Sequence, residues 1–290
     1  MDPAKDKAAA AGGTPPLPPL SVAYFGAETS FTHQAALRQF GTHVTALSMA
    51  TIADVFDAVE QGKVHEGVVP VENSTEGAIT VTFDLFSDKA VTIAAEVYMR
   101  IHHHLLANGP LEAITVVYSH PQVFGQCRRW LQQHLPGRSL VEVGSTPLAA
   151  ARAAAEPNAA ALAGTLAADK HGLKVLHRNI EDSTENTTRF LVLSKQAPLP
   201  TGDDKTSLMF GVEDRVGALY DALVPFKENG VNLSMILSRP SRKRTWDYVF
   251  FVDFQGHIHD AASQRAVEGL RRHCRSVKHL GSYPRAAGKG

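Results

Sequence analysis

Short apolar runs and amphipathic segments alternate along the first two-thirds of the chain. Residues 21–25 and 67–71 are apolar runs that predict buried strands, whereas residues 30–40 and 52–61 carry apolar side chains at helical spacing. The alternation continues through predicted strands at 91–106, 114–118, 140–143, 174–176 and 188–193 and predicted helices at 79–86, 121–131 and from 145 onward. Repeated strand–helix units predict an α/β fold, a largely parallel sheet covered by helices.

One segment near residue 100 interrupts this pattern. Residues 91–106 read as a strand, but Arg100 and the run His102–His104 make it unusually polar. We interpret it as a crossing between two lobes, lobe 1 at about 21–99 and 181–196 and lobe 2 at about 100–180. The first domain, residues 21–196, is then a two-lobed, periplasmic-binding-protein-like unit with a cleft at the hinge.

The last third of the chain has a different pattern. Residues 197–205 are rich in proline, glycine and acidic side chains and predict a linker. Predicted elements then follow as strand 206–212, helix 217–229, strand 231–238, strand 246–254, helix 260–272 and strand 277–283. This β-α-β-β-α-β order predicts a ferredoxin-like domain at 206–285. The first 20 residues, rich in alanine, glycine and proline, predict a disordered tail.

Composition narrows the class of partner. The 290 residues hold 29 Lys plus Arg and 29 Asp plus Glu, so no net field favours nucleic acid or an anionic membrane. No apolar run approaches the roughly 20 residues of a membrane span. The two cysteines, Cys127 and Cys274, fall in different predicted domains. We therefore expect reduced thiols in a cytoplasmic protein whose ligand is a small molecule.

Hydroxyl-rich turns follow the predicted strands. Ser30 and Thr32 lie in the first turn, and Asn73, Ser74 and Thr75 follow the strand at 67–71. In open α/β sheets ligands bind at such strand ends, and a helix N-terminus attracts anions. The same hydroxyls also fit a purely capping role. Glu72 is the one acidic side chain that we place beside them.

The segment Asn186–Phe190 is the centre of the predicted cleft. If a strand begins at once, Thr188 and Phe190 share one face and Arg189 takes the other. If Thr188 still belongs to the loop, Thr188 and Arg189 both face the cleft. Both alternatives stay open.

The histidine run near the crossing has three interpretations. On a strand His102 and His104 share a face, which two metal ligands require. No third ligand follows at suitable spacing. A histidine in the cleft or a solvated strand is the better interpretation, and we expect no metal.

These motifs together resemble one family. Residues 25–36 (FGAETSFTHQAA), 69–79 (VPVENSTEGAI), 103–106 (HHLL), 119–127 (SHPQVFGQC) and 186–193 (NTTRFLVL) resemble successive signatures of prephenate dehydratase. Residues 217–240 and 246–257 are similar to the regulatory ACT domain of that family.

The resemblance implies decarboxylative dehydration of prephenate to phenylpyruvate, in phenylalanine biosynthesis, without a cofactor. It assigns Thr188 as donor to the leaving hydroxyl, Arg189 as carboxylate ligand, and Glu72 or a relayed water as the ultimate proton source. The implied substrate-binding residues are Ser30, Thr32, Asn73, Ser74, Thr75 and Phe190, the last by packing the strand in place.

The resemblance also implies that L-phenylalanine binds the ACT domain at a dimer interface and inhibits a homodimer or homotetramer. The implied effector-binding residues are Gly217, Ala218, Leu219, Asn232, Ser238, Arg239 and Pro240. One position departs from the pattern, because the family's Glu-Ser-Arg-Pro is Leu237–Pro240 here. The missing carboxylate puts the strength and identity of the effector response in question.

Two other functions fit the same residues. Nothing in the sequence separates prephenate from arogenate, its amino-acid analogue, as the substrate. A two-lobed small-molecule sensor without chemistry would use the same cleft. Because the residues before position 21 cannot form a helical chorismate mutase domain, we expect a monofunctional enzyme.

Overall fold

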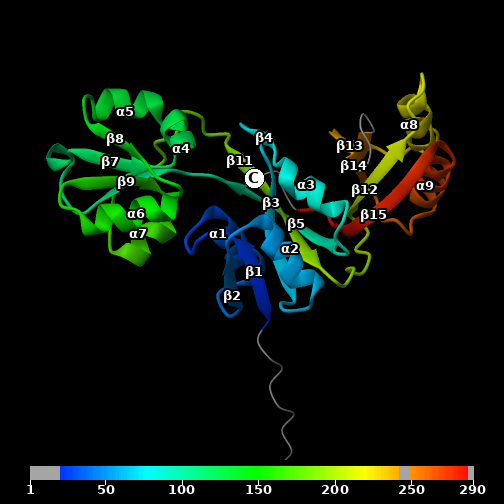
Figure 1. Ribbon diagram of the computed structural model, residues 1–290, viewed down its shortest axis with the longest axis horizontal. Coiled ribbons are helices and arrows are strands. Elements are labelled where there is room, and N and C mark those ends of the chain that lie inside the picture. Colours follow the sequence, from blue (N-terminus) through cyan, green and yellow to red (C-terminus); the bar gives the residue numbers. More distant parts are fainter. Residues whose placement is uncertain (1–19, 242–247, 287–290) are drawn as a thin grey trace, which may run out of the picture.

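A computed structural model describes residues 20–241 and 248–286, and they form three sheets (Figure 1). Residues 1–19 of the predicted disordered tail lie outside the described residues. So do residues 246–247 of the strand predicted at 246–254. The fold class, a two-lobed α/β domain followed by a βαββαβ domain, is confirmed. Within the described residues no helix is long and apolar enough to cross a bilayer.

Lobe 1 is built on a six-stranded sheet in the order β2-β1-β3-β11-β5, with β4 paired to β3. Its elements are β1 (Ser21–Phe25), α1 (Phe31–Phe40), β2 (Thr45–Met49), α2 (Ile52–Glu60), β3 (Glu66–Asn73), β4 (Gly77–Ala78), α3 (Thr80–Phe86), β5 (Thr92–Arg100) and β11 (Thr187–Ser194). Strands β1, β2 and β3 are parallel, as predicted, but β11 is antiparallel to both of its neighbours. The reason is that β11 re-enters lobe 1 from the opposite lobe.

Lobe 2 has a five-stranded sheet in the order β10-β6-β9-β7-β8. Its elements are β6 (His104–Ala107), η1 (Leu111–Ala113), β7 (Val116–Ser119), α4 (Pro121–Gln126), α5 (Arg128–His134), β8 (Ser139–Glu142), α6 (Thr146–Ala155), β9 (Ala159–Ala163), α7 (Thr165–His171) and β10 (Lys174–His177). Among the described residues, strands β2, β4 and β9 differ from the prediction, which has no strand there, and the single strand predicted at 91–106 is two strands, β5 and β6. In Figure 1 lobe 2 lies at the left, and extended segments connect it to lobe 1.

The C-terminal domain is a four-stranded antiparallel sheet in the order β13-β14-β12-β15 with two helices. Its elements are β12 (Asp204–Val212), α8 (Ala218–Glu228), β13 (Leu233–Pro240), β14 (Tyr248–Gln255), α9 (Ala261–His273) and β15 (Cys274–Pro284). Strand alternation divides its apolar side chains. Phe210, Val252 and Phe254 pack with the helices, whereas Phe251, Leu280 and Tyr283 pack with lobe 1.

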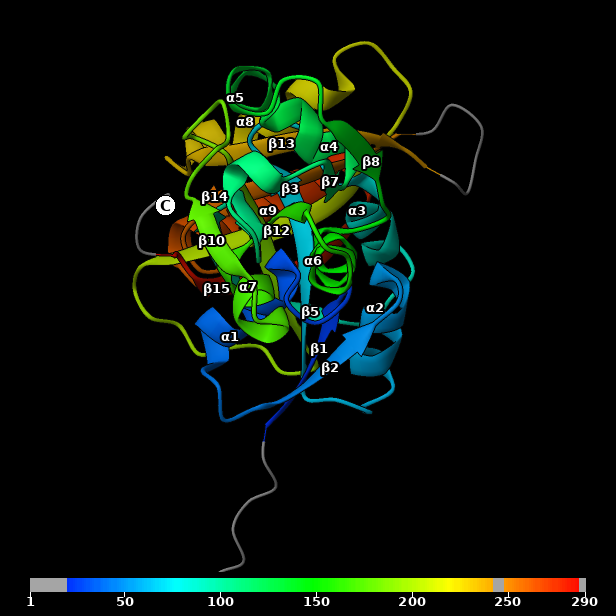
Figure 2. The same cartoon turned by 90° about the vertical axis from the view of Figure 1, so that its left-hand side faces the viewer.

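The domains are therefore stacked along one axis, lobe 2, lobe 1 and then the C-terminal sheet (Figures 1 and 2). The helix-free face of the C-terminal sheet continues the core of lobe 1, where Phe83 of α3 meets Phe251 with ring centroids 5.0 Å apart. Strand β11 lies between the lobe cleft and this second junction. Side chains of β11 can therefore face the lobe cleft on one side of the sheet and the junction with the C-terminal sheet on the other.

Candidate active site

The hinge between the lobes is a pair of extended segments. Residues 101–103 lead from β5 to β6, and residues 178–186 return to β11. They bond to each other, with Ile101 N donating to Asn186 O at 2.8 Å and Ile180 N to His103 O at 2.9 Å. The pairing places His103 and Asn186 between the lobes.

A bulge in β3 decides which side chains lie beside Thr188. Antiparallel pairing sets Thr188 opposite Asn73 and Arg189 opposite Glu72, and the register then shifts so that Val71 is an extra residue on β3. A bulge reverses the alternation of side chains beyond it. Asn73 therefore shares a face with Thr188, and Glu72 shares the other face with Arg189.

Thr188 is held by one defined hydrogen bond. Its Oγ1 accepts from Asn73 Nδ2 at 2.8 Å. The orientation of the Asn73 amide is fixed because its Oδ1 accepts from the backbone N–H groups of Thr75 at 2.9 Å and Glu76 at 3.1 Å. Since Oγ1 accepts from Asn73, the hydroxyl hydrogen of Thr188 points elsewhere and is free to donate.

A chain of amides carries this geometry across the cleft. Asn73 Nδ2 also donates to Asn186 Oδ1 at 2.8 Å, and Asn186 Nδ2 donates to Gln126 Oε1 at 3.2 Å. The same Gln126 Oε1 lies 2.9 Å from His103 Nε2. Because an amide oxygen only accepts, the network assigns the proton of His103 to Nε2 and leaves Nδ1 as a bare acceptor.

His103 is neutral in this setting. Burial lowers its pKa below the usual value. Its Nδ1 is buried and has no partner among the described residues, and its ring packs edge-on against Phe31 with centroids 5.5 Å apart. The neighbouring Glu181 is charged, because bonds from His102 at 2.6 Å and the His103 amide at 2.9 Å outweigh burial and lower its pKa.

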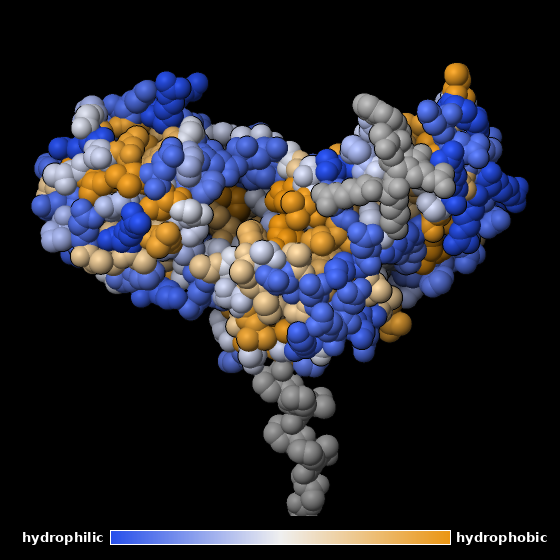
Figure 3. All heavy atoms as spheres, viewed as in Figure 1, coloured by the Kyte–Doolittle hydropathy of each residue, from blue (hydrophilic) through white to orange (hydrophobic). Residues whose placement is uncertain are grey.

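A cavity of about 810 Å³ lies between the hinge and α4. It is lined by Thr75, Glu76, His120, Pro121, Gln122, Gly125, Gln126, Glu181, Asp182, Ser183 and Asn186. Figure 3 shows the surface hollowed between lobe 2 and the rest of the molecule. The volume suits a small organic molecule, and Asn186 connects its wall to Thr188 through Asn73.

Ser30 and Thr32, which the sequence predicted to bind substrate, do not line this cavity, although both lie next to Phe31 at the hinge. Ser30 is the N-cap of α1, where its Oγ accepts from His33 N at 3.2 Å, and Thr32 is buried in the first turn. Between them Phe31 contacts His103. The capping role of Ser30 is thus visible, and it leaves the N-terminal end of α1 beside the hinge.

The three residues after β3 differ in role. Ser74 Oγ donates to Glu185 O and accepts from Thr187 N, both at 2.9 Å, so it fastens the turn to the hinge. Thr75 Oγ1 donates to Asn186 Oδ1 at 3.4 Å and lines the cavity. Phe190, on the Thr188 face, is fully buried in the lobe 1 core.

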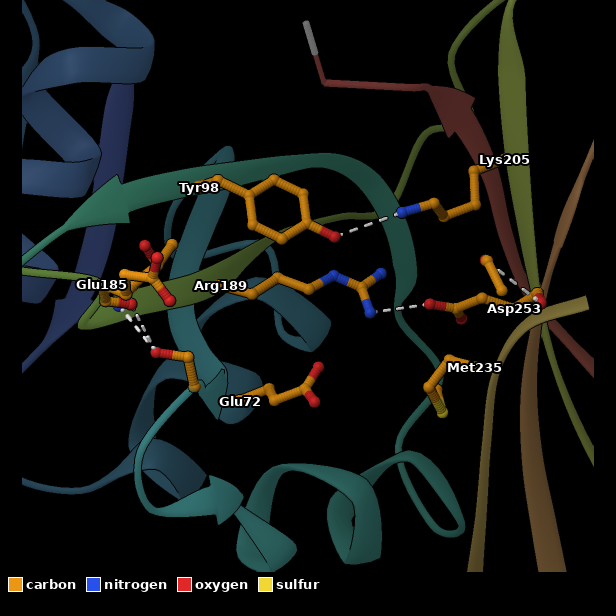
Figure 4. A pocket seen from close by; sticks show the side chains of 10 residues that line it. Glu72, Tyr98, Glu185, Arg189, Lys205, Met235 and Asp253 are labelled. Atoms are coloured by element: carbon orange, nitrogen blue, oxygen red, sulfur yellow. Dashed lines mark hydrogen bonds and ion pairs between the residues drawn. The ribbon is translucent and has the colours of Figure 1, made fainter. Parts of the chain in front are cut away.

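The structure does not bring Arg189 or Glu72 to Thr188. Of the two arrangements that the sequence left open, β11 begins at Thr187, so Arg189 points to the opposite face. Its guanidinium is bonded to Glu96 and to Asp253 of the C-terminal sheet. Glu72 lines a second cavity on that same side, of about 320 Å³, between β11 and the C-terminal sheet (Figure 4). The physical cause is strand alternation combined with the Val71 bulge.

The predicted effector residues fall in two places. Gly217 is the N-cap of α8 with φ of 80°, a left-handed conformation that suits glycine, and Ala218 and Leu219 begin the helix. Asn232 precedes β13, and Ser238, Arg239 and Pro240 end it. Arg239 is engaged across the junction, because its Nε and Nη2 bond to the two carboxylate oxygens of Asp84 at 3.1 and 3.0 Å.

Leu237 stands where the family pattern has a glutamate, and its surroundings suit an apolar side chain. Its side chain is half-buried against the core shared by lobe 1 and the C-terminal sheet. A carboxylate at this position would lose hydration in that contact, whereas leucine adds apolar area.

Three residues of the network had not been assigned individual roles. His103, Gln126 and Asn186 belong to the motifs 103–106, 119–127 and 186–193, so the sequence marked their segments. It did not show that they meet, because Gln126 and Asn186 are 60 residues apart in the chain.

The histidine run does not form a ligand cluster. His102 pairs with Glu181, and His104 Nδ1 accepts from Asn179 N at 3.0 Å. In the described part of the chain no three His, Cys, Asp or Glu side chains come together as a metal site would require.

Fold and site together define a class, a two-lobed α/β enzyme-like domain with a polar cleft at its hinge and a βαββαβ domain behind it. Residues 22–198 match the family model of prephenate dehydratase, and residues 206–272 match that of the ACT domain. The chain belongs to the prephenate dehydratase family, a family of lyases, and carries a C-terminal ACT domain.

Individual relatives agree along nearly the whole chain. The bifunctional chorismate mutase/prephenate dehydratase of Pseudomonas aeruginosa is 47% identical over 270 residues, 92% of this chain and 74% of that one. The structure of prephenate dehydratase from Arthrobacter aurescens in complex with L-Phe has a TM-score of 0.84 and 32% identity, covering 92% of this chain and 90% of that one.

A third similar structure has a different description. GqqA, described as a novel type of quorum quenching acylase, gives a TM-score of 0.84 and 28% identity, over 92% of this chain and 98% of that one. The shared architecture therefore includes proteins with different stated activities.

Proposed function

We propose that this protein converts prephenate to phenylpyruvate, carbon dioxide and water. The ring carboxylate leaves as carbon dioxide, its bonding electron pair enters the ring, and the ring hydroxyl leaves with a proton as water. Aromatisation drives the reaction, so the protein must orient the substrate and supply that proton. The observation that carries the proposal is the Thr188 hydroxyl, which accepts from Asn73 and is thereby left with its hydrogen free to donate.

In this mechanism Thr188 Oγ1 passes its proton to the departing hydroxyl and regains a proton from a relayed water, and Asn73 is the positioning residue that aims the Thr188 hydroxyl. Thr75, Asn186 and Gln126 offer polar groups at the cavity wall. The N-terminal end of α1, with Ser30 and Thr32, offers unpaired N–H groups to a substrate carboxylate. We assign no carboxylate or proton to Arg189 and Glu72, because both lie on the other face of the sheet.

The same geometry argues against an acylase reaction at Thr188. A threonine nucleophile needs a neighbouring base to take its proton. Here the partner of Oγ1 is the amide of Asn73, which donates to it and is no base.

The test is phenylpyruvate formation from prephenate. Thr188→Val removes the hydroxyl at constant shape and should lower kcat by about 10²–10⁴-fold, the usual range for a positioned acid. Asn73→Ala should lower kcat less, because it misaims the donor without removing it. Thr45→Val, the same change at an exposed site on edge strand β2, is the matched control and should be unaffected.

Each outcome separates the candidate functions. Turnover of arogenate with none of prephenate would make the protein an arogenate dehydratase. Binding of both compounds without turnover would support a sensor. Full activity in Thr188→Val would remove Thr188 from the mechanism.

We further propose that L-phenylalanine binds the ACT domain and inhibits, through Gly217–Leu219, Asn232 and Ser238–Pro240. A homodimer or homotetramer joined through the ACT domains fits the exposed apolar side chains of Val216, Tyr220 and Ile236, the last on edge strand β13. Light scattering with and without L-phenylalanine tests the assembly. We place the protein in the cytoplasm, since both cysteines are free thiols.

A further inference from the structure

The residue next to Thr188 reaches into the other domain. Arg189 Nε donates to Glu96 Oε2 at 2.9 Å, within lobe 1. Its Nη1 lies 2.7 Å from Asp253 Oδ2, and its Nη2 donates to Tyr283 Oη at 3.0 Å, both in the ACT sheet. Figure 4 shows the Arg189 side chain extending from β11 toward Asp253.

A relay of donors fixes the ACT side of this contact. Ser207 Oγ donates its hydrogen to Asp253 Oδ1 at 2.6 Å. The Tyr283 hydroxyl lies 2.7 Å from Ser207 Oγ, and because the Ser207 hydrogen is already used, Tyr283 is the donor in that bond. Tyr283 can then only accept from Arg189. Each group has its donor or acceptor role determined by its neighbour, so the guanidinium has one well-defined position.

Charge within this buried set is balanced. Lys205 Nζ lies 2.7 Å from both oxygens of Glu96, so two cations face two carboxylates. Arg189, Glu96, Asp253 and Lys205 are all buried, and Tyr98 lies beside both cations. Removing one partner would leave an uncompensated charge away from water, so the contact resists rearrangement.

We propose that Arg189 is a positioning residue through which the ACT sheet holds β11 and thereby sets the position of the Thr188 hydroxyl. Thr188 and Arg189 are adjacent in one strand, so a displacement of the guanidinium moves the neighbouring side chain. A donor misplaced by about 1 Å can cost roughly 10²-fold in rate. The proposal rests on the proposed dehydratase activity for its kinetic reading.

A second ion pair at the same junction provides the matched control. Arg239 of β13 bonds Asp84 of α3 through two hydrogen bonds, and α3 is not part of β11. If the junction served only to keep the domains together, losing this pair and losing the Asp253 contact would have similar kinetic effects.

The experiment compares Asp253→Asn and Tyr283→Phe with Asp84→Asn in the full chain. Neither Asp253 nor Tyr283 lies in the cleft. We expect each of the first two changes to lower kcat at least about tenfold with KM for prephenate within about twofold, because orientation and not binding is lost. Asp84→Asn should keep both constants within about twofold of wild type.

Amide hydrogen exchange gives a readout that needs no substrate turnover. The amides of residues 187–190 should exchange faster in Asp253→Asn and Tyr283→Phe than in wild type. In Asp84→Asn their exchange rates should equal those of wild type. If wild type turns over prephenate and kcat is unchanged in both Asp253→Asn and Tyr283→Phe, the proposal is overturned. An equal loss of kcat in all three variants would also overturn it. If wild type does not act on prephenate, the dehydratase assignment fails while the exchange comparison still decides whether the ACT sheet holds β11.

Discussion

At the residue scale, the hydrogen bonds that each polar side chain already makes determine which of its atoms faces the next residue of the site. Asn73 has its oxygen fixed by two backbone N–H groups, so its nitrogen must face Thr188 and Asn186. This determines the direction of every bond as far as His103. Thr188 owes its free hydrogen to that order, and not to any unusual acidity.

A second residue, far from the cleft, predicts a pH dependence of stability. Glu66 begins β3, and burial raises the pKa of its carboxyl from 4.5 to about 7, although Ser194 donates to it at 3.1 Å. The folded protein therefore holds this proton more tightly than the unfolded chain. Its stabilising effect is complete below pH 4.5 and is lost as the pH rises through about 7.

Glu66→Gln removes that titration. We expect the free energy of unfolding of wild type to fall between about pH 4.5 and 7 by an increment that the glutamine variant lacks. Urea unfolding at a series of pH values measures it. Parallel pH curves for the two proteins would contradict the raised pKa.

At the element scale, close packing of strands under helices determines where small residues must stand. Strand β9 (Ala159–Ala163) is fully buried in the middle of the lobe 2 sheet, although four of its five residues are alanine. Alanine favours helices, so local propensity pointed away from a strand. Burial between α6 on one face of the sheet and α4 and α5 on the other overrides it.

Gly67 shows the same constraint in β3. A Cβ at this position would lie 2.7 Å from Val55 Cγ1 and 2.8 Å from Val59 Cγ2 of α2. Gly67→Ala should therefore lower the free energy of unfolding by about 1–3 kcal/mol through overpacking. Chemical denaturation measures it against Gly125→Ala, where an added Cβ meets nothing within 4 Å and helix propensity improves. Equal stability of the two variants would show that α2 can move.

At the scale of the whole molecule, the ACT domain is packed on lobe 1 as a continuation of its core. Thr92 Oγ1 donates to Leu280 O at 3.1 Å, and Gly281 lies against the backbone of Ile93. A Cβ at Gly281 would clash with the Ile93 carbonyl oxygen, a contact with main chain that no side-chain rotation can relieve.

Gly281→Ala should accordingly separate the two domains. We expect one calorimetric unfolding transition in wild type and two in the variant, because the shared core no longer couples the domains. Gly144→Ala, at an open position in lobe 2, is the control and should keep a single transition. A single transition of wild-type shape in Gly281→Ala would show that the junction is not rigid.

The sequence by itself determined the large features. Periodicity separated strands from helices, the linker separated two domains, and the motifs named the family and marked Thr188. These features are local, because each follows from residues close together in the chain. The polar interruption near residue 100 also indicated the lobe crossing without any structure.

Only the tertiary structure decided which marked residues meet. Strand β9 forms because its neighbours bury it, and the Val71 bulge turns Asn73 toward Thr188 and Glu72 away. Arg189 reaches Asp253 and Tyr283 because a separate domain docks on that face of the sheet. Such contacts join residues tens to more than a hundred positions apart, and a pattern of period 2 or 3.6 contains no information about them.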